Sequence, residues 1–133
     1  MTGIRGLAEV VLVVQDLERS LAFYRDLLGL TVISPPTLPA VFLRVGEERE
    51  GVPQQIVLVP RGAGAARAAA GTAERVLHHI GLEVAPDRYD AERARLAAAG
   101  LNVRDGAHPF LPVEAFYVDD PDGNEVELVR RTG

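Results

Sequence analysis

The chain has no cysteine and no tryptophan, and only four phenylalanines and three tyrosines among its 133 residues. The missing cysteine excludes disulfides, thiolate catalysis and cysteine-based zinc sites. The missing tryptophan removes a side chain well suited to stacking against a planar ligand. A net charge of −5, with no cluster of basic residues, argues against nucleic-acid binding.

Long apolar runs are also missing. No stretch approaches the roughly 20 residues that a membrane-spanning helix needs. The N-terminal segment Met1–Gly6 lacks the apolar core of a signal peptide. We therefore expect a cytoplasmic protein with no membrane or nucleic-acid partner. With 47% hydrophobic and 25% charged residues, the chain can build one globular domain with its own core.

Local patterns predict the same order of elements twice. Asp16 is a suitable N-cap for the first helix, which Gly29 ends, and Gly100 ends the second helix. The expected helices are residues 17–28 and 89–99, and the expected strands are residues 8–14, 30–34, 41–45, 55–59, 77–84, 101–103 and the two arms of a hairpin over 116–129.

A near-constant offset relates the two halves. The segments 10–14 and 80–84 match at an offset of 70, the segments 29–32 and 100–103 at 71, and the segments 57–59 and 127–129 at 70. Two copies of one strand-helix-strand-strand-strand unit explain such an offset. We predict a single α+β domain over residues 1–133, with two βαβββ repeats that form a curved mixed sheet around a cavity. The expected parts are repeat 1 (about 5–60), a connector (61–76) and repeat 2 (about 77–131).

Strand alternation places four equivalent positions on one face of the predicted sheets. Glu9 and His79 are equivalent in the first strands of the repeats, and Val57 and Glu127 in the last strands. An imidazole with two carboxylates can bind a divalent first-row metal ion and balance its charge. Three protein ligands leave coordination positions open, as in catalytic sites. The sequence therefore predicts a metal site at Glu9, His79 and Glu127.

These motifs resemble the vicinal oxygen chelate superfamily, which includes glyoxalases, bleomycin-resistance proteins and extradiol dioxygenases. The resemblance covers essentially the whole chain and rests on residues 9–16 with 20–29, residues 79–84, and the Asp-Pro-Asp-Gly-Asn-Glu-Val-Glu run over 120–127. It implies a glyoxalase-like fold, a homodimer, and metal residues at the four positions named above. Two positions depart from the family pattern, because Glu9 stands where histidine is most common and Val57 cannot bind a metal.

The resemblance also implies a divalent ion (Zn, Ni, Mn, Fe or Co) and a small substrate that chelates it through two neighbouring oxygens. We expect a lyase- or isomerase-like enzyme, with Glu127 and Glu9 as the candidate catalytic carboxylates. Dioxygenase chemistry is less favoured, because its family pattern has two histidines and one carboxylate. The alternative is a metal-free drug-binding protein of the bleomycin-resistance type. For that function Glu9, Glu83, Glu125 and the negative net charge would suit a cationic ligand.

Two further histidines lie near the predicted site. Strand alternation predicts that His78 points to the face opposite His79. His108 lies in a loop over residues 105–112 that could cover the cavity mouth.

Overall fold

An apolar strand, β1 (Glu9–Val14), begins the first sheet of the protein. The structure is a computed structural model that describes residues 3, 6–62 and 77–133. In β1 the side chains of Leu12 and Val14 are buried, whereas Val11 and Val13 are 51% and 43% exposed. Successive side chains of a strand point to opposite faces, so β1 has a packed face and an open face.

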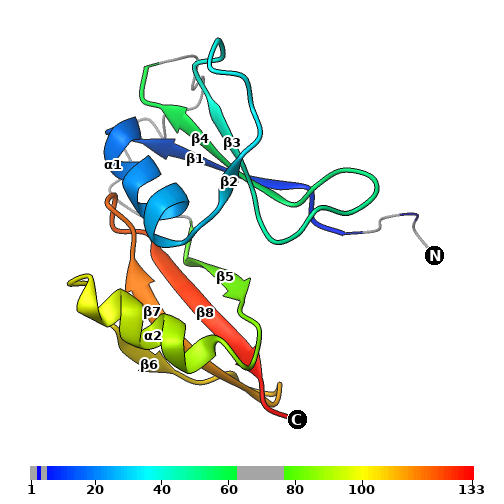
Figure 1. The fold of residues 1–133 in the computed structure, drawn as a ribbon, viewed down its shortest axis with the longest axis vertical. Helices are drawn as coiled ribbons and strands as arrows, with labels where there is room; N and C mark the ends of the chain where they lie inside the picture. Colours follow the sequence, from blue (N-terminus) through cyan, green and yellow to red (C-terminus); the bar gives the residue numbers. More distant parts are fainter. Residues whose placement is uncertain (1–2, 4–5, 63–76) are drawn as a thin grey trace. The chain divides into compact units, whose positions relative to one another are not determined.

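The chain divides into two compact units, Met1–Gly71 and Thr72–Gly133. The first unit holds a four-stranded sheet in the order β1-β4-β3-β2, and Figure 1 shows its helix against one face of that sheet. The strands β1 and β4 are parallel, and the other neighbours are antiparallel. The remaining strands are β2 (Thr31–Val32), β3 (Val41–Arg44) and β4 (Gln55–Pro60).

The helix of the first unit changes type partway along. α1 (Leu17–Leu21) begins after Asp16, whose Oδ1 accepts a hydrogen bond from the Arg19 amide at 3.2 Å, as an N-cap should. It continues as a π-helical segment, η1 (Ala22–Leu27). The wider turn brings Phe23 and Tyr24 into the core together, with ring centroids 4.8 Å apart. The helix predicted over residues 17–28 is therefore confirmed in extent, and its second half is π-helical.

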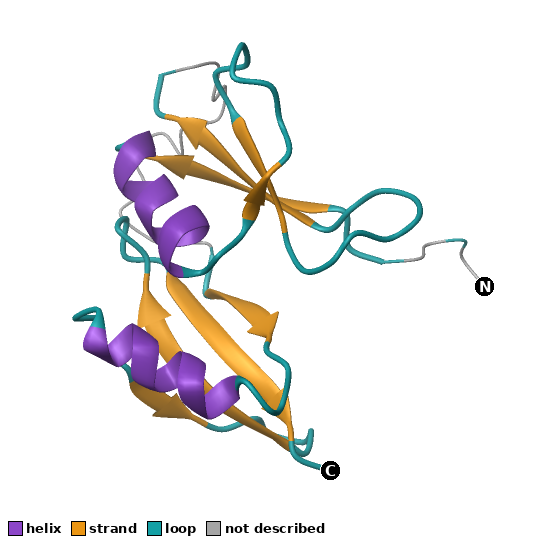
Figure 2. Cartoon of the chain, viewed as in Figure 1, coloured by secondary structure: helices purple, strands orange, loops and turns teal. Residues whose placement is uncertain are grey.

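The second unit repeats this arrangement. Its sheet has the order β5-β8-β7-β6, with β5 and β8 parallel and the other neighbours antiparallel. α2 lies along one face of the sheet (Figure 2), where Tyr89 packs against Phe116 with ring centroids 5.2 Å apart. The elements are β5 (His79–Glu83), α2 (Tyr89–Ala98), β6 (Arg104–Gly106), β7 (Val113–Asp119) and β8 (Glu125–Arg131).

The two sheets share one topology, which confirms the predicted pair of βαβββ modules. Most of the predicted connector 61–76 lies outside the described residues, since 63–76 are not among them. No helix in the described part of the chain is long and apolar enough to span a bilayer.

The predicted strand at 101–103 is wrong. The edge strand is β6, whose three residues pair with Ala115–Tyr117 of β7. An apolar pattern marked 101–103, but a short edge strand is defined by its partner. Here Arg104 binds the Asp119 carboxylate through two hydrogen bonds of 3.1 and 2.7 Å, which fixes β6 beside β7. The strand predicted at 30–34 is likewise reduced to the two residues of β2 that pair with β3.

Candidate functional site

The turn between β7 and β8 sets the register of the candidate site. Asp120 is 5% exposed, and its Oδ1 accepts hydrogen bonds from the backbone amides of Asp122 at 2.9 Å and Asn124 at 2.7 Å. A fixed turn fixes the register of the two strands, and a slip of one residue would turn every side chain to the other face. In this register Glu127 lies between Tyr117 of β7 and Gly81 of β5.

We call Gly81, Glu127 and Tyr117 the polar row. The Tyr117 hydroxyl donates a hydrogen bond to Glu127 Oε2 at 2.7 Å. This bond, followed by burial, raises the pKa of Tyr117 to about 12, so the phenol stays protonated at neutral pH and remains a donor. Glu127 Oε1 lies over Gly81, where an added Cβ would be only 3.0 Å away. The glycine therefore leaves room for the carboxylate.

A second glycine makes room for the tyrosine ring. A Cβ added to Gly106 of β6 would lie 2.2 Å from Tyr117 Cε2, so the ring occupies the space of the missing side chain. Any larger residue at 106 would displace the ring and with it the hydroxyl that binds Glu127. Sequence reasoning assigned no role to Tyr117, Gly81 or Gly106. Tyr117 could have been found by counting outward from the turn over 120–123, since antiparallel register places it opposite Glu127.

His79 lies on the same face of this sheet as Glu127. It begins β5 opposite Glu125, two positions from the Gly81–Glu127 pair. Its ring meets the Tyr117 ring edge to face, with centroids 5.6 Å apart. Tyr117 therefore contacts both of the predicted ligands of the second unit.

Strand alternation predicted that His78 and His79 point to opposite faces, but in the structure their rings are in contact. The two Nδ1 atoms are 2.7 Å apart, and the ring centroids are 5.0 Å apart. The prediction was wrong because β5 begins at His79, so His78 precedes the strand and is not bound by its alternation.

The carboxylates on this face differ in their charge partners. Arg104 lies 3.9 Å from Glu125 and forms a closer ion pair with Asp119. Glu127, by contrast, forms no ion pair with any side chain in residues 3, 6–62 and 77–133; among these residues its side chain bonds to the neutral Tyr117 hydroxyl. An ionised carboxylate that is half-buried without a cation is costly, so a bound cation would stabilise Glu127.

A cavity of about 370 Å³ opens over the same face. His108 lines it, and the His108 Nδ1 accepts hydrogen bonds from the backbone amides of Phe110 at 3.2 Å and Leu111 at 2.9 Å. The lining combines carboxylates and arginines with apolar side chains, namely Gly81, Glu83, His108, Leu111, Val113, Glu127, Val129, Arg130 and Arg131. The cavity can therefore hold a small ligand against Glu127.

The equivalent positions of the first unit are occupied differently. Glu9 is exposed at the start of β1, opposite Gln55. Val57 is 3% exposed and lies between Val11 and Phe42. Within the described residues no three His, Asp or Glu side chains gather in a way that would hold a metal ion. His79 and Glu127 belong to the second unit and Glu9 to the first, so the three-ligand site stays a prediction.

The donor atoms of the second unit nevertheless fit a divalent ion. Glu127 Oε1 accepts no hydrogen bond from the described residues, because its Tyr117 bond uses Oε2. His79 Nε2 likewise has no hydrogen-bond partner among the described residues, and the bond of this ring to His78 is made through Nδ1. One carboxylate oxygen and one imidazole nitrogen are ligands that first-row divalent ions accept.

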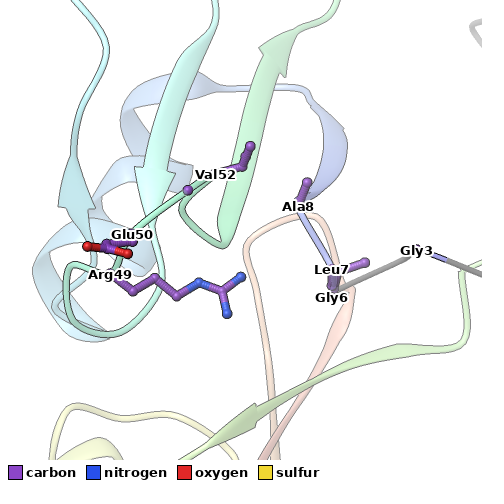
Figure 3. Close-up of a pocket in the computed structure, with 8 residues that line it drawn as sticks. Gly3, Gly6, Leu7, Ala8, Arg49, Glu50 and Val52 are labelled. Atoms are coloured by element: carbon purple, nitrogen blue, oxygen red, sulfur yellow. The ribbon is translucent and has the colours of Figure 1, made fainter.

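Figure 3 shows a different cavity, of about 340 Å³, in the first unit. Arg49 extends toward Gly6, with Nη2 3.6 Å from the place of a Cβ on that glycine, while the Glu50 carboxylate points away. None of the predicted site residues lines it; the lining is Gly3, Gly6, Leu7, Ala8, Arg49, Glu50, Gly51 and Val52. This cavity is therefore separate from the proposed chemistry.

Comparison with known proteins agrees with the fold. The model of the Glyoxalase/Bleomycin resistance protein/Dioxygenase superfamily matches residues 6–128. A solved glyoxalase/dioxygenase from Nostoc punctiforme superposes with a TM-score of 0.72 at 18% identity, over 98% of this chain and 94% of that one.

Two curated relatives are similar in sequence. Biphenyl-2,3-diol 1,2-dioxygenase of Paraburkholderia xenovorans (strain LB400) is 31% identical over an alignment 143 residues long, gaps included, which covers 96% of this chain and 41% of the relative. Catechol-2,3-dioxygenase of Bacillus subtilis (strain 168) is 30% identical over 123 residues, covering 88% and 38%. The chain thus spans about two-fifths of the length of these relatives.

Proposed function

The chain belongs to the Glyoxalase/Bleomycin resistance protein/Dioxygenase superfamily, and from this premise we propose that it is a metal-dependent enzyme acting on a small molecule. The proposed reaction class is lyase- or isomerase-like, with a substrate that chelates a divalent ion through two neighbouring oxygens. The observation that carries the proposal is the Glu127 carboxylate, which a neutral tyrosine hydroxyl holds on the same face as His79 and which has no ion-pair partner among the described residues.

The proposed ligands are His79 through Nε2, Glu127 through Oε1, and Glu9 at the position equivalent to His79 in the first unit. Glu9 is supported by the repeat, which gives β1 and β5 the same place in their sheets. Val57 takes the fourth equivalent position and supplies no donor, so three protein ligands would leave room for substrate or water.

Each residue around Glu127 has a role that follows from its contacts. Tyr117 fixes the carboxylate plane by donating to Oε2, which leaves Oε1 directed over Gly81. Hydrogen-bonded ligand carboxylates are typical of metal sites, because the outer partner orients the ligand. The side chains of Leu111, Val113 and Val129 would exclude water from the apolar part of a ligand in the cavity.

A divalent ion bound there would supply Lewis-acid polarisation of a substrate oxygen. Glu127 and Glu9 are the proposed catalytic carboxylates, either of which would accept a proton from a carbon beside that oxygen. The curated relatives are named for catechol and biphenyl-2,3-diol, which carry two neighbouring hydroxyl groups. These names support the proposal that this chain also acts on a substrate with two adjacent oxygens.

Titration with Co²⁺, followed by calorimetry and visible absorption, tests the proposal. We expect stoichiometric binding by the native protein and a loss of about 100-fold or more in affinity for Glu127→Gln and His79→Gln. A lost ligand should cost at least as much as the 10–100-fold typical of a lost outer partner. Glu47→Gln, an exposed carboxylate in a loop of the first unit, is the matched control and should bind normally.

Two other outcomes identify competing functions. If neither native nor metal-soaked protein holds an ion, and a cationic glycopeptide binds tightly in the presence of EDTA, the protein is a metal-free binding protein of the bleomycin-resistance type. The acidic residues Glu83 and Glu127 in the cavity lining would then hold the cation. If metal-loaded protein consumes O₂ with a catechol, the metal role stands and the lyase- or isomerase-like class is wrong.

A further inference from the structure

Two histidines that are adjacent in sequence share one hydrogen bond beside the proposed site. The Nδ1 atoms of His78 and His79 are 2.7 Å apart. Two neutral imidazoles can be this close only if one nitrogen carries a proton and the other offers a lone pair. The contact therefore couples the tautomer of one ring to the tautomer of the other.

The two possible arrangements differ at Nε2 of His79. If His79 donates from Nδ1, its Nε2 carries a lone pair and can bind a metal ion. If His78 donates instead, His79 Nε2 carries the proton and cannot bind. Only the first arrangement is compatible with a metal ion on the cavity face.

We infer that His78 is a positioning residue, which accepts the Nδ1–H of His79 and so holds His79 in the tautomer that binds a metal ion through Nε2. This inference rests on the proposed function. Metal-bound histidines usually donate their other ring nitrogen to a carboxylate, backbone carbonyl or water. Here the acceptor would be a second imidazole.

The surroundings of the two rings agree with this division of roles. His79 is half-buried, and its ring lies edge to face against Tyr117, with an interplanar angle of 80° that fixes the ring plane. His78 is exposed, so its own Nε2–H can bond to water while Nδ1 accepts. The Tyr117 ring and the His78 nitrogen together fix the orientation of His79 from two sides.

Long-range ¹H–¹⁵N NMR of the imidazoles reads the tautomers directly, without any turnover. We expect the Zn²⁺-loaded protein to show His79 protonated at Nδ1 and His78 at Nε2. His108 is the internal reference, because its Nδ1 accepts two backbone amides and its proton must lie on Nε2. Metal-free protein should show one Nδ1–H shared by the pair.

Three substitutions of His78 distinguish a positioning role of this residue from a packing role. In His78→Asn the side-chain oxygen can accept in place of Nδ1, so Co²⁺ affinity should stay close to native. His78→Leu has no acceptor and His78→Lys offers only donors, so both should weaken binding by about 10-fold or more. A merely structural role would not separate the asparagine variant from the leucine variant.

The outcomes distinguish this inference from the proposed function. If the native protein binds Co²⁺ and all three variants bind it equally tightly, the metal site stands and the role of His78 is overturned. If metal-free protein shows both Nδ1 atoms unprotonated, the shared bond does not exist and the inference is likewise overturned. If NMR shows the shared proton but no divalent ion binds, the proposed function fails, and so does the role of His78 as a ligand-orienting residue.

Discussion

The same three positions are apolar in the first unit and polar in the second. In the first sheet Val57 lies between Val11 and Phe42, and in the second Glu127 lies between Gly81 and Tyr117. The strands and pairing directions are the same. Only the side chains differ, so the comparison isolates what a carboxylate needs at this place in the fold.

The difference shows that the carboxylate depends on both neighbours. Tyr117 supplies a donor where the first unit has the ring of Phe42, and Gly81 supplies space where the first unit has the branched side chain of Val11. A carboxylate at position 57 would have neither this donor nor this space beside it on the neighbouring strands. The polar row is therefore a set of three residues that depend on one another.

The largest effect is expected for Val57→Glu, which places a carboxylate in the apolar row. Val57 is 3% exposed, and its two strand neighbours, Val11 and Phe42, carry no side-chain donor, so we expect metal-free protein to lose about 4 kcal/mol of unfolding free energy at neutral pH. Urea denaturation in the presence of EDTA measures this loss of unfolding free energy. Val11→Glu is the control, because this neighbour on the next strand is half exposed and should change stability by about 0.5 kcal/mol or less. Equal effects of the two variants would contradict the account.

The next effect concerns the turn that fixes the polar row. Asp120→Ala removes a buried carboxylate that accepts two backbone amides, and we expect a loss of about 3 kcal/mol in unfolding free energy. Asp119→Ala removes an exposed surface ion pair with Arg104 and should cost about 1 kcal/mol or less. Thermal unfolding of both variants tests the contrast. A loss for Asp120→Ala no greater than for Asp119→Ala would mean that the turn does not fix the register.

A smaller effect is expected for Gly106→Ala. The added methyl group would meet the Tyr117 ring, so we expect a loss of about 2 kcal/mol and a weaker bond to Glu127. The same change in a Tyr117→Leu background should cost much less, because the ring is gone, and the double-mutant cycle measures that coupling. If the losses of unfolding free energy from Gly106→Ala and Tyr117→Leu simply add, the Tyr117 ring does not require a glycine at position 106.

The smallest effect is expected for Tyr117→Phe. This variant gives the second unit the phenylalanine that the first unit has at the equivalent position, Phe42. Loss of one hydrogen bond should cost about 1 kcal/mol at neutral pH. The Tyr117 pKa is raised to about 12 from 10.0 by its bond to Glu127, so this stabilisation is fully present below pH 10 and is lost as pH rises toward 12. The native protein should therefore lose stability over that range more steeply than Tyr117→Phe. Parallel pH curves for the two proteins would contradict the assignment.

Much of the fold was predictable because the repeat and the alternation of side chains act over many residues. The offset of 70 to 71 predicted two equal modules, which the shared strand order confirms. The alternation that places Glu127 on one face of β8 places Val126 and Leu128 on the other, where both side chains are buried. These features depend on burial summed along whole strands.

The predictions were wrong where a contact with a single other residue or strand determines the local structure. The edge strand lies at 104–106 because of pairing with β7 and the ion pair of Arg104 with Asp119, neither of which leaves an apolar pattern. His78 precedes β5, so alternation said nothing about its contact with His79. For the site, sequence supplied the candidate ligands Glu9, His79 and Glu127, but not the tyrosine and glycines that hold Glu127 in place.

An anomalous difference map from crystals grown with Zn²⁺, recorded on both sides of the zinc absorption edge, tests the central claim most directly. We predict one strong peak about 2.0–2.2 Å from a carboxylate oxygen of Glu127 and from Nε2 of His79, and no peak beside Val57. A map with no peak at Glu127, or with the ion bound only by other residues, would contradict the claim that the polar row of the second unit holds a metal ion.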